Sequence, residues 1–241
     1  MARPSTEKRL IRGITVAALG AAAIASVGCG DTDPGALVTP DCMAAEGEML
    51  PWKTGNKWTY LVNDEGVVSM KETTIGAMEP VGGTGPNKDV AAFKVVTAKG
   101  AMDQTISWQA PMGESVVRYR EQSYSASTGE LELEEHWDPY KLHVDGTAAH
   151  RVGGASWLVI YQETKLPVGG TPETHEAHDR WTILSACESV TVPAGTFTAV
   201  SIQKVSATGG SAKTYWYMPG VGKVKESGGQ LEELVSYVPG P

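Results

Sequence analysis

The amino-acid sequence consists mainly of short segments of β-strand type, and no stretch sustains a helical period of 3.6 residues over three turns. Alternating or β-branched segments are separated by clusters of Gly, Pro, Asn and Asp, the residues that turns require. The first such segment places Trp58, Tyr60 and Val62 on one face of a strand, and the turn sequence of residues 63–66 follows it. The pattern predicts an all-β domain.

The strand-type segments are numerous enough for one large antiparallel sheet. We expect strands at residues 58–62, 67–75, 90–97, 105–109, 115–124, 130–137, 157–161, 181–192, 196–206, 214–218, 223–226 and 232–238. Residues 80–87 and 171–180 are interpreted as loops. About ten to twelve antiparallel strands predict a single curved sheet, a half-barrel or a barrel, with few and short helices.

The segment of residues 130–137 alternates strictly. Leu131 and Leu133 fall on one face, and Glu132, Glu134 and His136 fall on the other. Such alternation is typical of an antiparallel sheet with one face in water. We therefore interpret the glutamates as a solubilising edge.

Two turns in the last third of the sequence have clear local signatures. Pro193 presets φ for a turn between two strands, and Gly195 supplies a residue that tolerates positive φ. Pro219 and Gly220 suit a type II turn, and Gly222 leaves room for a bulge or a close backbone approach.

The N-terminal 28 residues have the layout of a secretory signal peptide. A basic start precedes an apolar stretch at residues 14–27, and Cys29 follows Gly28 directly. A cysteine at this point resembles the lipobox of bacterial lipoproteins, in which the thiol is acylated. Two alternatives stay open: ordinary cleavage that leaves Cys29 as a thiol, and a retained membrane helix, for which the stretch is short against the roughly 20 residues needed.

These features predict the organisation and the location of the chain. Residues 1–28 form a lipoprotein signal peptide, residues 29–50 form a flexible tether that starts at acylated Cys29, and residues 51–241 form the β domain. We expect a lipid-anchored protein of the cell envelope. Gly30, in place of Asp after the cysteine, favours the outer membrane by analogy with known lipoproteins.

The charge of the chain argues against nucleic-acid partners. The formal net charge is −8, and removal of residues 1–28 leaves 16 Lys and Arg against 27 Asp and Glu. An acidic surface repels nucleic acid and anionic headgroups. The membrane lipid partner would therefore be bound through the acyl chains on Cys29.

Acylation of Cys29 would leave Cys42 and Cys187 as an even pair. An oxidising compartment permits a disulfide between them, with a structural role. The alternative is two separate thiols.

Three motifs resemble a group of bacterial lipoproteins and exported domains of unknown function, called TapB-like. They are Gly-Asn-x-Trp-x-Tyr at residues 55–60, Val-Pro-Ala-Gly-Thr-Phe at residues 192–197, and Tyr-Trp-Tyr-x-Pro-Gly-Val-Gly-x-Val-Lys at residues 215–225. The resemblance covers about 25 residues. It implies a half-barrel similar to the lipoprotein carriers LolA and LolB, and it implies no activity or catalytic residue.

The functional prediction is a non-enzymatic binding protein. A concave sheet would hold an apolar ligand or lipid, and the candidate binding residues are Trp58, Tyr60, Trp108, Trp157, Trp181 and Trp216. Each of these rings has the simpler alternative of forming the core. The alternative function is a structural or assembly factor of the cell envelope that binds a protein partner without a ligand cavity.

No cofactor, metal site or catalytic residue is predicted. His175 and His178 are three residues apart on a predicted loop, and they lack the spacing and the helix of the His-Glu-x-x-His zinc motif. His136, His143 and His150 recur every seven residues, but an odd spacing alternates the face of a strand, so we expect no shared site.

Overall fold

The computed structural model describes residues 47–241, except residues 101, 207, 208 and 210. All of the described residues belong to one compact unit. Residues 1–46, with the predicted signal peptide, most of the tether, Cys29 and Cys42, lie outside the described residues, and the predictions for them stay predictions.

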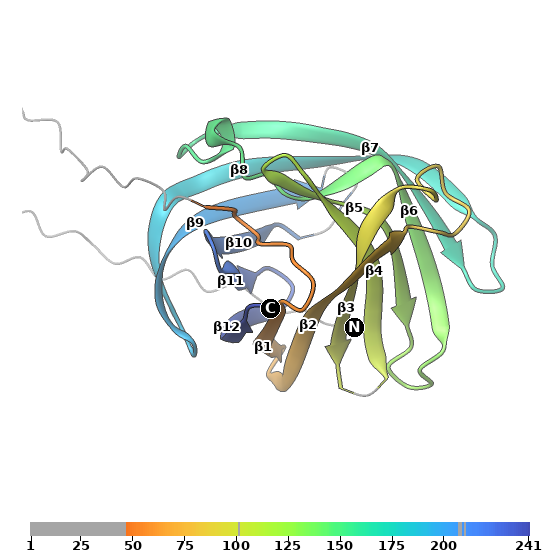
Figure 1. Ribbon diagram of the computed structural model, residues 1–241, viewed down its shortest axis with the longest axis horizontal. Coiled ribbons are helices and arrows are strands. Elements are labelled where there is room, and N and C mark those ends of the chain that lie inside the picture. Colours follow the sequence, from red (N-terminus) through yellow and green to blue (C-terminus); the bar gives the residue numbers. More distant parts are fainter. Residues whose placement is uncertain (1–46, 101, 207–208, 210) are drawn as a thin grey trace, which may run out of the picture. The chain divides into compact units, whose positions relative to one another are not determined.

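In the described part of the chain, twelve strands form one closed antiparallel barrel (Figure 1). Each strand pairs with its neighbours in the sequence, and β1 closes the barrel by pairing with β12. The strands are β1 (Lys57–Asp64), β2 (Val67–Pro80), β3 (Ala91–Lys99), β4 (Asp103–Met112), β5 (Ser115–Tyr124), β6 (Leu131–Val144), β7 (Ser156–Pro167), β8 (Glu173–Val192), β9 (Gly195–Ser206), β10 (Lys213–Met218), β11 (Gly222–Ser227) and β12 (Leu231–Val238). The predicted all-β fold class is confirmed, and the sheet takes the closed form.

Helical structure is scarce in the described residues. The 3₁₀ helix η1 (Ala148–His150) lies between β6 and β7. None of the described helical structure is long and apolar enough to cross a lipid bilayer.

The β1–β2 turn follows from the residues that form it. Asp64 pairs with Val67, so Glu65 and Gly66 form a two-residue loop with φ values of 49° and 93°. Positive φ at both positions is the signature of the type I′ turn, whose twist matches that of paired strands. The Asn63 side chain accepts a 2.8 Å hydrogen bond from the Gly66 N–H and stabilises the turn.

The two turns predicted in the last third of the sequence have the expected backbone. Gly195 and Gly220 have φ values of 130° and 80°. Gly222 has a φ of 104°, and a Cβ atom there would come within 2.9 Å of Leu50 Cδ1 and 3.1 Å of Trp58 Nε1. The close approach predicted at Gly222 is confirmed.

Tryptophan and tyrosine fill much of the barrel interior. Trp58, Trp137, Trp181 and Tyr217 are among the largest side chains with at most 1% of their surface exposed. The chain has only two phenylalanines, so these rings supply the bulk that a wide barrel needs. The segment that precedes β1 adds to this core, because Leu50 is buried against it.

One predicted loop is wrong. Residues 171–180 were expected to be irregular, but β8 begins at Glu173 and runs through them. Ala177, Asp179 and Trp181 alternate as buried residues along this part of the strand. The strand period was hidden in the sequence because two of these inward residues are a small alanine and a charged aspartate.

The prediction of a wet, solubilising face on residues 130–137 is also wrong for two of its members. His136 is only 4% exposed, and its Nε2 lies 2.8 Å from Glu134 Oε1. Glu134 also forms an ion pair with Arg120. The closed barrel has no free edge here, since β6 pairs with both β5 and β7, so these side chains satisfy one another instead of protecting an edge.

Candidate binding cavity

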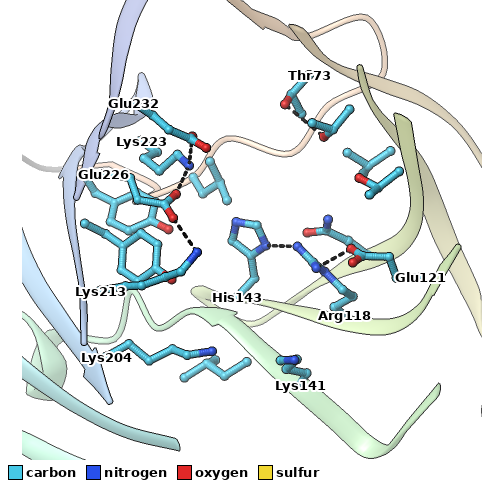
Figure 2. Close-up of a pocket in the computed structure, with 18 of the residues that line it drawn as sticks. Thr73, Arg118, Glu121, Lys141, His143, Lys204, Lys213, Lys223, Glu226 and Glu232 are labelled. Carbon is cyan, nitrogen blue, oxygen red and sulfur yellow. Dashed lines mark hydrogen bonds and ion pairs between the residues drawn. The ribbon is translucent and has the colours of Figure 1, made fainter. Parts of the chain in front are cut away.

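The barrel contains a cavity of about 600 Å³ that is partly open to solvent (Figure 2). Every strand except β7 contributes to its lining, as do Leu50 and Trp52 from the segment before β1. The volume lies within the range of about 300 to 1,000 Å³ that is typical of small-molecule sites. The lining combines aromatic rings with charged side chains that come from opposite parts of the barrel.

The aromatic part of the lining consists of Tyr60 and two groups of rings. Trp52 and Trp58 lie with their ring centroids 5.6 Å apart. Trp181, Tyr215 and Tyr217 form a row, with successive centroids 6.0 and 6.2 Å apart. Such offset contacts are the preferred geometry of aromatic pairs, so the rings present a preformed apolar wall.

A buried acid pair lies on the β11–β12 side of the cavity. Glu226 and Glu232 are directly opposite one another on these strands, and both are at most 5% exposed. Lys223 contacts both carboxylates, and Lys71 forms an ion pair with Glu232. Burial alone would raise the pKa of Glu226, but the charge of Lys223 outweighs it and holds that pKa far below its ordinary value.

The lysines of this group respond differently to burial. Burial, together with the charge of Lys223, lowers the pKa of Lys71 to about 8. Burial would also lower the pKa of Lys223, but Glu226 and Glu232 outweigh it and keep that pKa well above its ordinary value. Lys223 is therefore the fixed cation that neutralises the acid pair.

On the β5–β6 and β9–β10 sides the lining is mainly cationic, and its one carboxylate, Glu121, forms an ion pair with Arg118. We call Arg118, Lys141, Lys204 and Lys213 the cation cluster. All four line the cavity, and Figure 2 shows them arranged around His143. Arg118 Nη2 lies 3.3 Å from His143 Nδ1. Burial, reinforced by the Arg118 charge, holds the pKa of His143 well below its ordinary value, so the ring is neutral at pH 7.

The structure brings together three of the six predicted binding residues. Trp58, Tyr60 and Trp181 line the cavity. Trp108 instead packs in a separate cluster with Val81 and donates a 2.9 Å hydrogen bond to Glu79.

The remaining two predicted residues lie near the cavity but do not line it. Trp157 stacks on His150 at a centroid distance of 3.8 Å and on Trp181 at 6.4 Å. Trp216 precedes Tyr217 and therefore points to the other face of β10, where Lys225 lies 5.8 Å from its ring.

The charged lining was missed by reasoning from the sequence. A usable signal exists in β9 and β10. Val200, Ile202 and Lys204 alternate on β9, and Lys213 continues the alternation of Tyr215 and Tyr217 on β10. A lysine that occupies an inward position at the end of an apolar period is a candidate lumen residue.

The histidines of β8 have separate partners. His175 Nε2 lies 3.1 Å from Glu163, whereas His178 Nε2 lies 2.6 Å from Glu176. Asp179 instead pairs with Lys204 and accepts a hydrogen bond from Tyr161. Within the described residues, no group of three or more His, Cys, Asp or Glu side chains is placed to hold a metal ion.

Cys187 lies in β8 and is half-buried. Its predicted partner, Cys42, lies outside the described residues, so the disulfide stays a prediction.

Comparisons with known proteins show a fold and no family. No protein-family model matches the chain, and no curated protein matches it. A solved structure of a presumed exported protein with YmcC-like fold from Bacteroides fragilis is similar, with a TM-score of 0.50 and 11% identity over 79% of this chain and 98% of that chain. A presumed lipoprotein from Parabacteroides distasonis gives a TM-score of 0.45 and 13% identity over 80% and 99%. The first likeness supports the barrel, and the TapB-like resemblance stays a prediction.

Proposed function

We propose that this protein is a lipid-anchored protein of the cell envelope whose barrel binds an amphiphilic small molecule. The observation that carries the proposal is the cavity of about 600 Å³, with rings such as Trp181 and Tyr217 on part of its wall and lysines such as Lys141 and Lys204 on another. A cavity of this size favours ligand binding over the alternative of a partner-binding factor without a cavity.

The charged lining modifies the expected ligand. A wholly apolar molecule would take water away from the lysine ammonium groups and offer them no hydrogen bond in return, which costs free energy. A molecule with one polar or ionic end and one apolar part would satisfy both kinds of wall. We therefore favour an amphiphile over a purely apolar ligand.

We assign the cavity a binding role and no catalytic step. Its acids Glu226 and Glu232 are engaged by Lys223, its acid Glu121 is engaged by Arg118, and His143 lies beside Arg118. These pairings engage the ionisable groups with one another, and we therefore assign them to shaping the cavity and binding the ligand.

The envelope location rests on the sequence around Cys29. Acylation there would anchor the chain, most simply with palmitate among its acyl chains, and Gly30 favours the outer membrane. The Bacteroides fragilis protein of similar fold is described as exported, which agrees with this location. Globomycin should block processing of the wild-type precursor. Normal membrane attachment of a Cys29→Ala variant would overturn the anchor.

Ligand binding is tested by native mass spectrometry of the full-length protein extracted from its own membranes in a mild non-ionic detergent. We expect a co-purifying amphiphile that is released on denaturation. A bare apo mass under conditions that preserve other lipid complexes would contradict the proposal.

A cavity-filling variant makes this test specific. Thr97 lines the cavity beside Thr73, with their hydroxyl oxygens 3.1 Å apart, and Thr97→Phe should fill part of the space and remove the adduct. Thr59→Phe is the matched control, because Thr59 lies between the inward residues Trp58 and Tyr60 and outside the lining. The adduct should survive in this control.

A further inference from the structure

The cation cluster contains two pairs of like charges that face each other across neighbouring strands. Arg118 lies directly opposite Lys141 on β5 and β6, and Lys204 lies directly opposite Lys213 on β9 and β10. All four side chains line the same cavity. Like charges placed directly opposite are destabilising, so this arrangement costs folding free energy twice. Each of the four cations has one carboxylate partner that offsets part of this cost, and a bound anion would offset more of it.

Two of the acids that neutralise the cluster lie behind it, outside the cavity lining. Glu163 Oε1 lies 3.2 Å from Lys141 Nζ, and Asp179 Oδ2 lies 3.0 Å from Lys204 Nζ. Neither acid lines the cavity, whereas Glu121 and Glu226, the partners of Arg118 and Lys213, do line it. A lysine ammonium has three donors, and one carboxylate at its back leaves donors for a ligand in front.

Other hydrogen bonds hold these rear acids in place. Trp137 Nε1 donates to Glu163 over 2.9 Å, and the Tyr161 hydroxyl donates to Asp179 over 2.9 Å. Asp179 is only 1% exposed and Glu163 only 7%. The two carboxylates therefore fix the positions of Lys141 and Lys204 without occupying the space that a ligand would enter.

The β11–β12 side of the cavity has the reverse arrangement. There Glu226 and Glu232 themselves line the cavity, with Lys223 between them. An anion placed there would meet two carboxylates with one lysine between them, whereas an anion at the cation cluster would meet four cationic groups and one lining carboxylate, Glu121, which is paired with Arg118. The electrostatic asymmetry orients an anionic ligand toward β5, β6 and β9.

Two further groups at the cluster suit an anion. His143 is neutral beside Arg118, so it brings no negative charge that would repel an anion. Trp181 is 1% exposed, lines the cavity, and its Nε1 donor has no hydrogen-bond partner among the described residues. Lys204 Nζ lies 5.6 Å from the centre of that indole ring. A buried indole N–H ordinarily has an acceptor, and a ligand oxygen would supply one.

We propose that the cation cluster is the head-group subsite of the cavity, and that the ligand is an amphiphile whose head is a carboxylate or a phosphate. The head would accept hydrogen bonds from Lys141, Lys204 and Arg118, and the apolar part would lie along the row of Trp181, Tyr215 and Tyr217. This inference rests on the proposed binding function and goes beyond it by naming the chemistry of the head group.

The test compares four probes on the full-length protein in nanodiscs of neutral phosphatidylcholine. The probes are dodecanoate, dodecyl phosphate, the uncharged 1-dodecanol, and inorganic phosphate, and the readout is the dissociation constant from intrinsic tryptophan fluorescence and calorimetry. We expect at least one anionic amphiphile to bind about tenfold more tightly than 1-dodecanol, as the loss of one charged hydrogen bond implies.

Two variants, each lacking one partner of Glu163, test whether the preference for an anionic amphiphile arises in the cavity. Lys141→Gln removes a cavity-lining partner of Glu163, while Lys165→Gln removes a half-exposed partner, 3.4 Å from the same carboxylate, that does not line the cavity. Glu163 keeps other partners in both variants, so both should fold. We expect Lys141→Gln to weaken the anionic amphiphile about tenfold and to leave 1-dodecanol unchanged, and Lys165→Gln to change neither.

A second variant guards against a folding defect. Lys213→Gln removes a half-exposed member of the cation cluster. Its partner Glu226 keeps the ion pair with Lys223, so the variant should remain stable. The cluster loses one positive charge, so the affinity for the anionic amphiphile should fall. Thermal denaturation without probe confirms that each variant is folded before its affinity is compared.

The outcomes separate this inference from the proposed function. Equal affinities for 1-dodecanol and both anionic amphiphiles, or equal effects of the Lys141 and Lys165 variants, would overturn the head-group subsite and leave ligand binding standing. If inorganic phosphate bound as tightly as dodecyl phosphate, with the same dependence on Lys141, the result would support the anion subsite and overturn the proposal that the ligand is an amphiphile. Failure of all four probes to bind would overturn both.

Discussion

The indole nitrogen of Trp58 donates a 2.6 Å hydrogen bond to the backbone carbonyl of Val221, which lies 163 residues later in the chain. The bond joins β1 to the turn between β10 and β11, close to the seam where β1 meets β12 and the barrel closes. Gly222 makes this contact feasible, because its missing side chain leaves room for the indole ring.

Replacing Gly222 should therefore destabilise the barrel. Gly222→Ala combines a positive φ of 104° with a Cβ atom that would come within 2.9 Å of Leu50 and 3.1 Å of Trp58. We expect a loss of about 2 to 4 kcal/mol in the free energy of unfolding, from backbone strain of about 1 kcal/mol and overpacking of about 1 to 3 kcal/mol. Urea denaturation measures the loss.

Gly66→Ala is the control for backbone strain alone. Its φ of 93° is similar, but nothing lies within 4 Å of the added Cβ. We expect a loss of about 1 kcal/mol. If both variants lost the same free energy, the contact with Trp58 would have no energetic role.

The ion pair between Asp179 and Lys204 should matter for stability. Asp179 is 1% exposed, so Asp179→Asn would leave the Lys204 ammonium buried without its carboxylate. Breaking one side of a buried pair costs about 3 to 5 kcal/mol. We expect a fall in the melting temperature that calorimetry detects.

An exposed ion pair is the comparison. The side chains of Lys88 and Asp89 are 53% and 86% exposed, and their pairing should contribute almost nothing. Asp89→Asn should therefore leave the melting temperature unchanged. If Asp179→Asn lowered the melting temperature as little as Asp89→Asn does, Lys204 would have found another partner or lost its proton.

Stability should fall in acid because of Glu163. Burial raises the pKa of this carboxyl, but a hydrogen bond from Trp137 and the charge of Lys141 outweigh burial and lower the pKa to about 2, from an ordinary value of 4.5. The folded state then binds the proton less readily than the unfolded state. The stabilisation is fully present above pH 4.5 and is lost as the pH falls toward 2, in total about 3 kcal/mol.

The pH dependence is checked by urea denaturation between pH 6 and pH 2, in the wild type and in Glu163→Gln. The variant lacks the titrating group, so its stability should be lower at pH 6 and should fall less steeply below pH 4.5. Parallel pH profiles for the two proteins would mean that other carboxylates carry the acid sensitivity.

Reduction should destabilise the domain if Cys42 and Cys187 are bonded. Removing a disulfide from an exported domain typically costs about 2 to 5 kcal/mol. We expect dithiothreitol to lower the stability of the wild type and to leave a Cys42→Ser/Cys187→Ser double variant unaffected. Alkylation of Cys187 in unreduced, denatured protein would rule the bond out.

Strands and tight turns were predictable because their signals are local. The alternation of Trp58, Tyr60 and Val62 spans five residues, and the Glu65–Gly66 turn needs only a flexible pair between two strands. The same rule failed at Glu173–Arg180, where inward Asp179 owes its burial to Tyr161 on β7 and Lys204 on β9. No local window contains those partners.

By itself, the amino-acid sequence determined the all-β class, the approximate positions of the strands except the first half of β8, and the turns at Gly195 and Gly220, since each depends on neighbouring residues. Only the tertiary structure decided that β1 pairs with β12, that Trp58 and Trp181 line the cavity while Trp108 does not, and that Lys141 and Lys204 share the cavity. The physical reason is that pairing, burial and charge compensation join residues from distant strands, and the closed barrel alone brings them together.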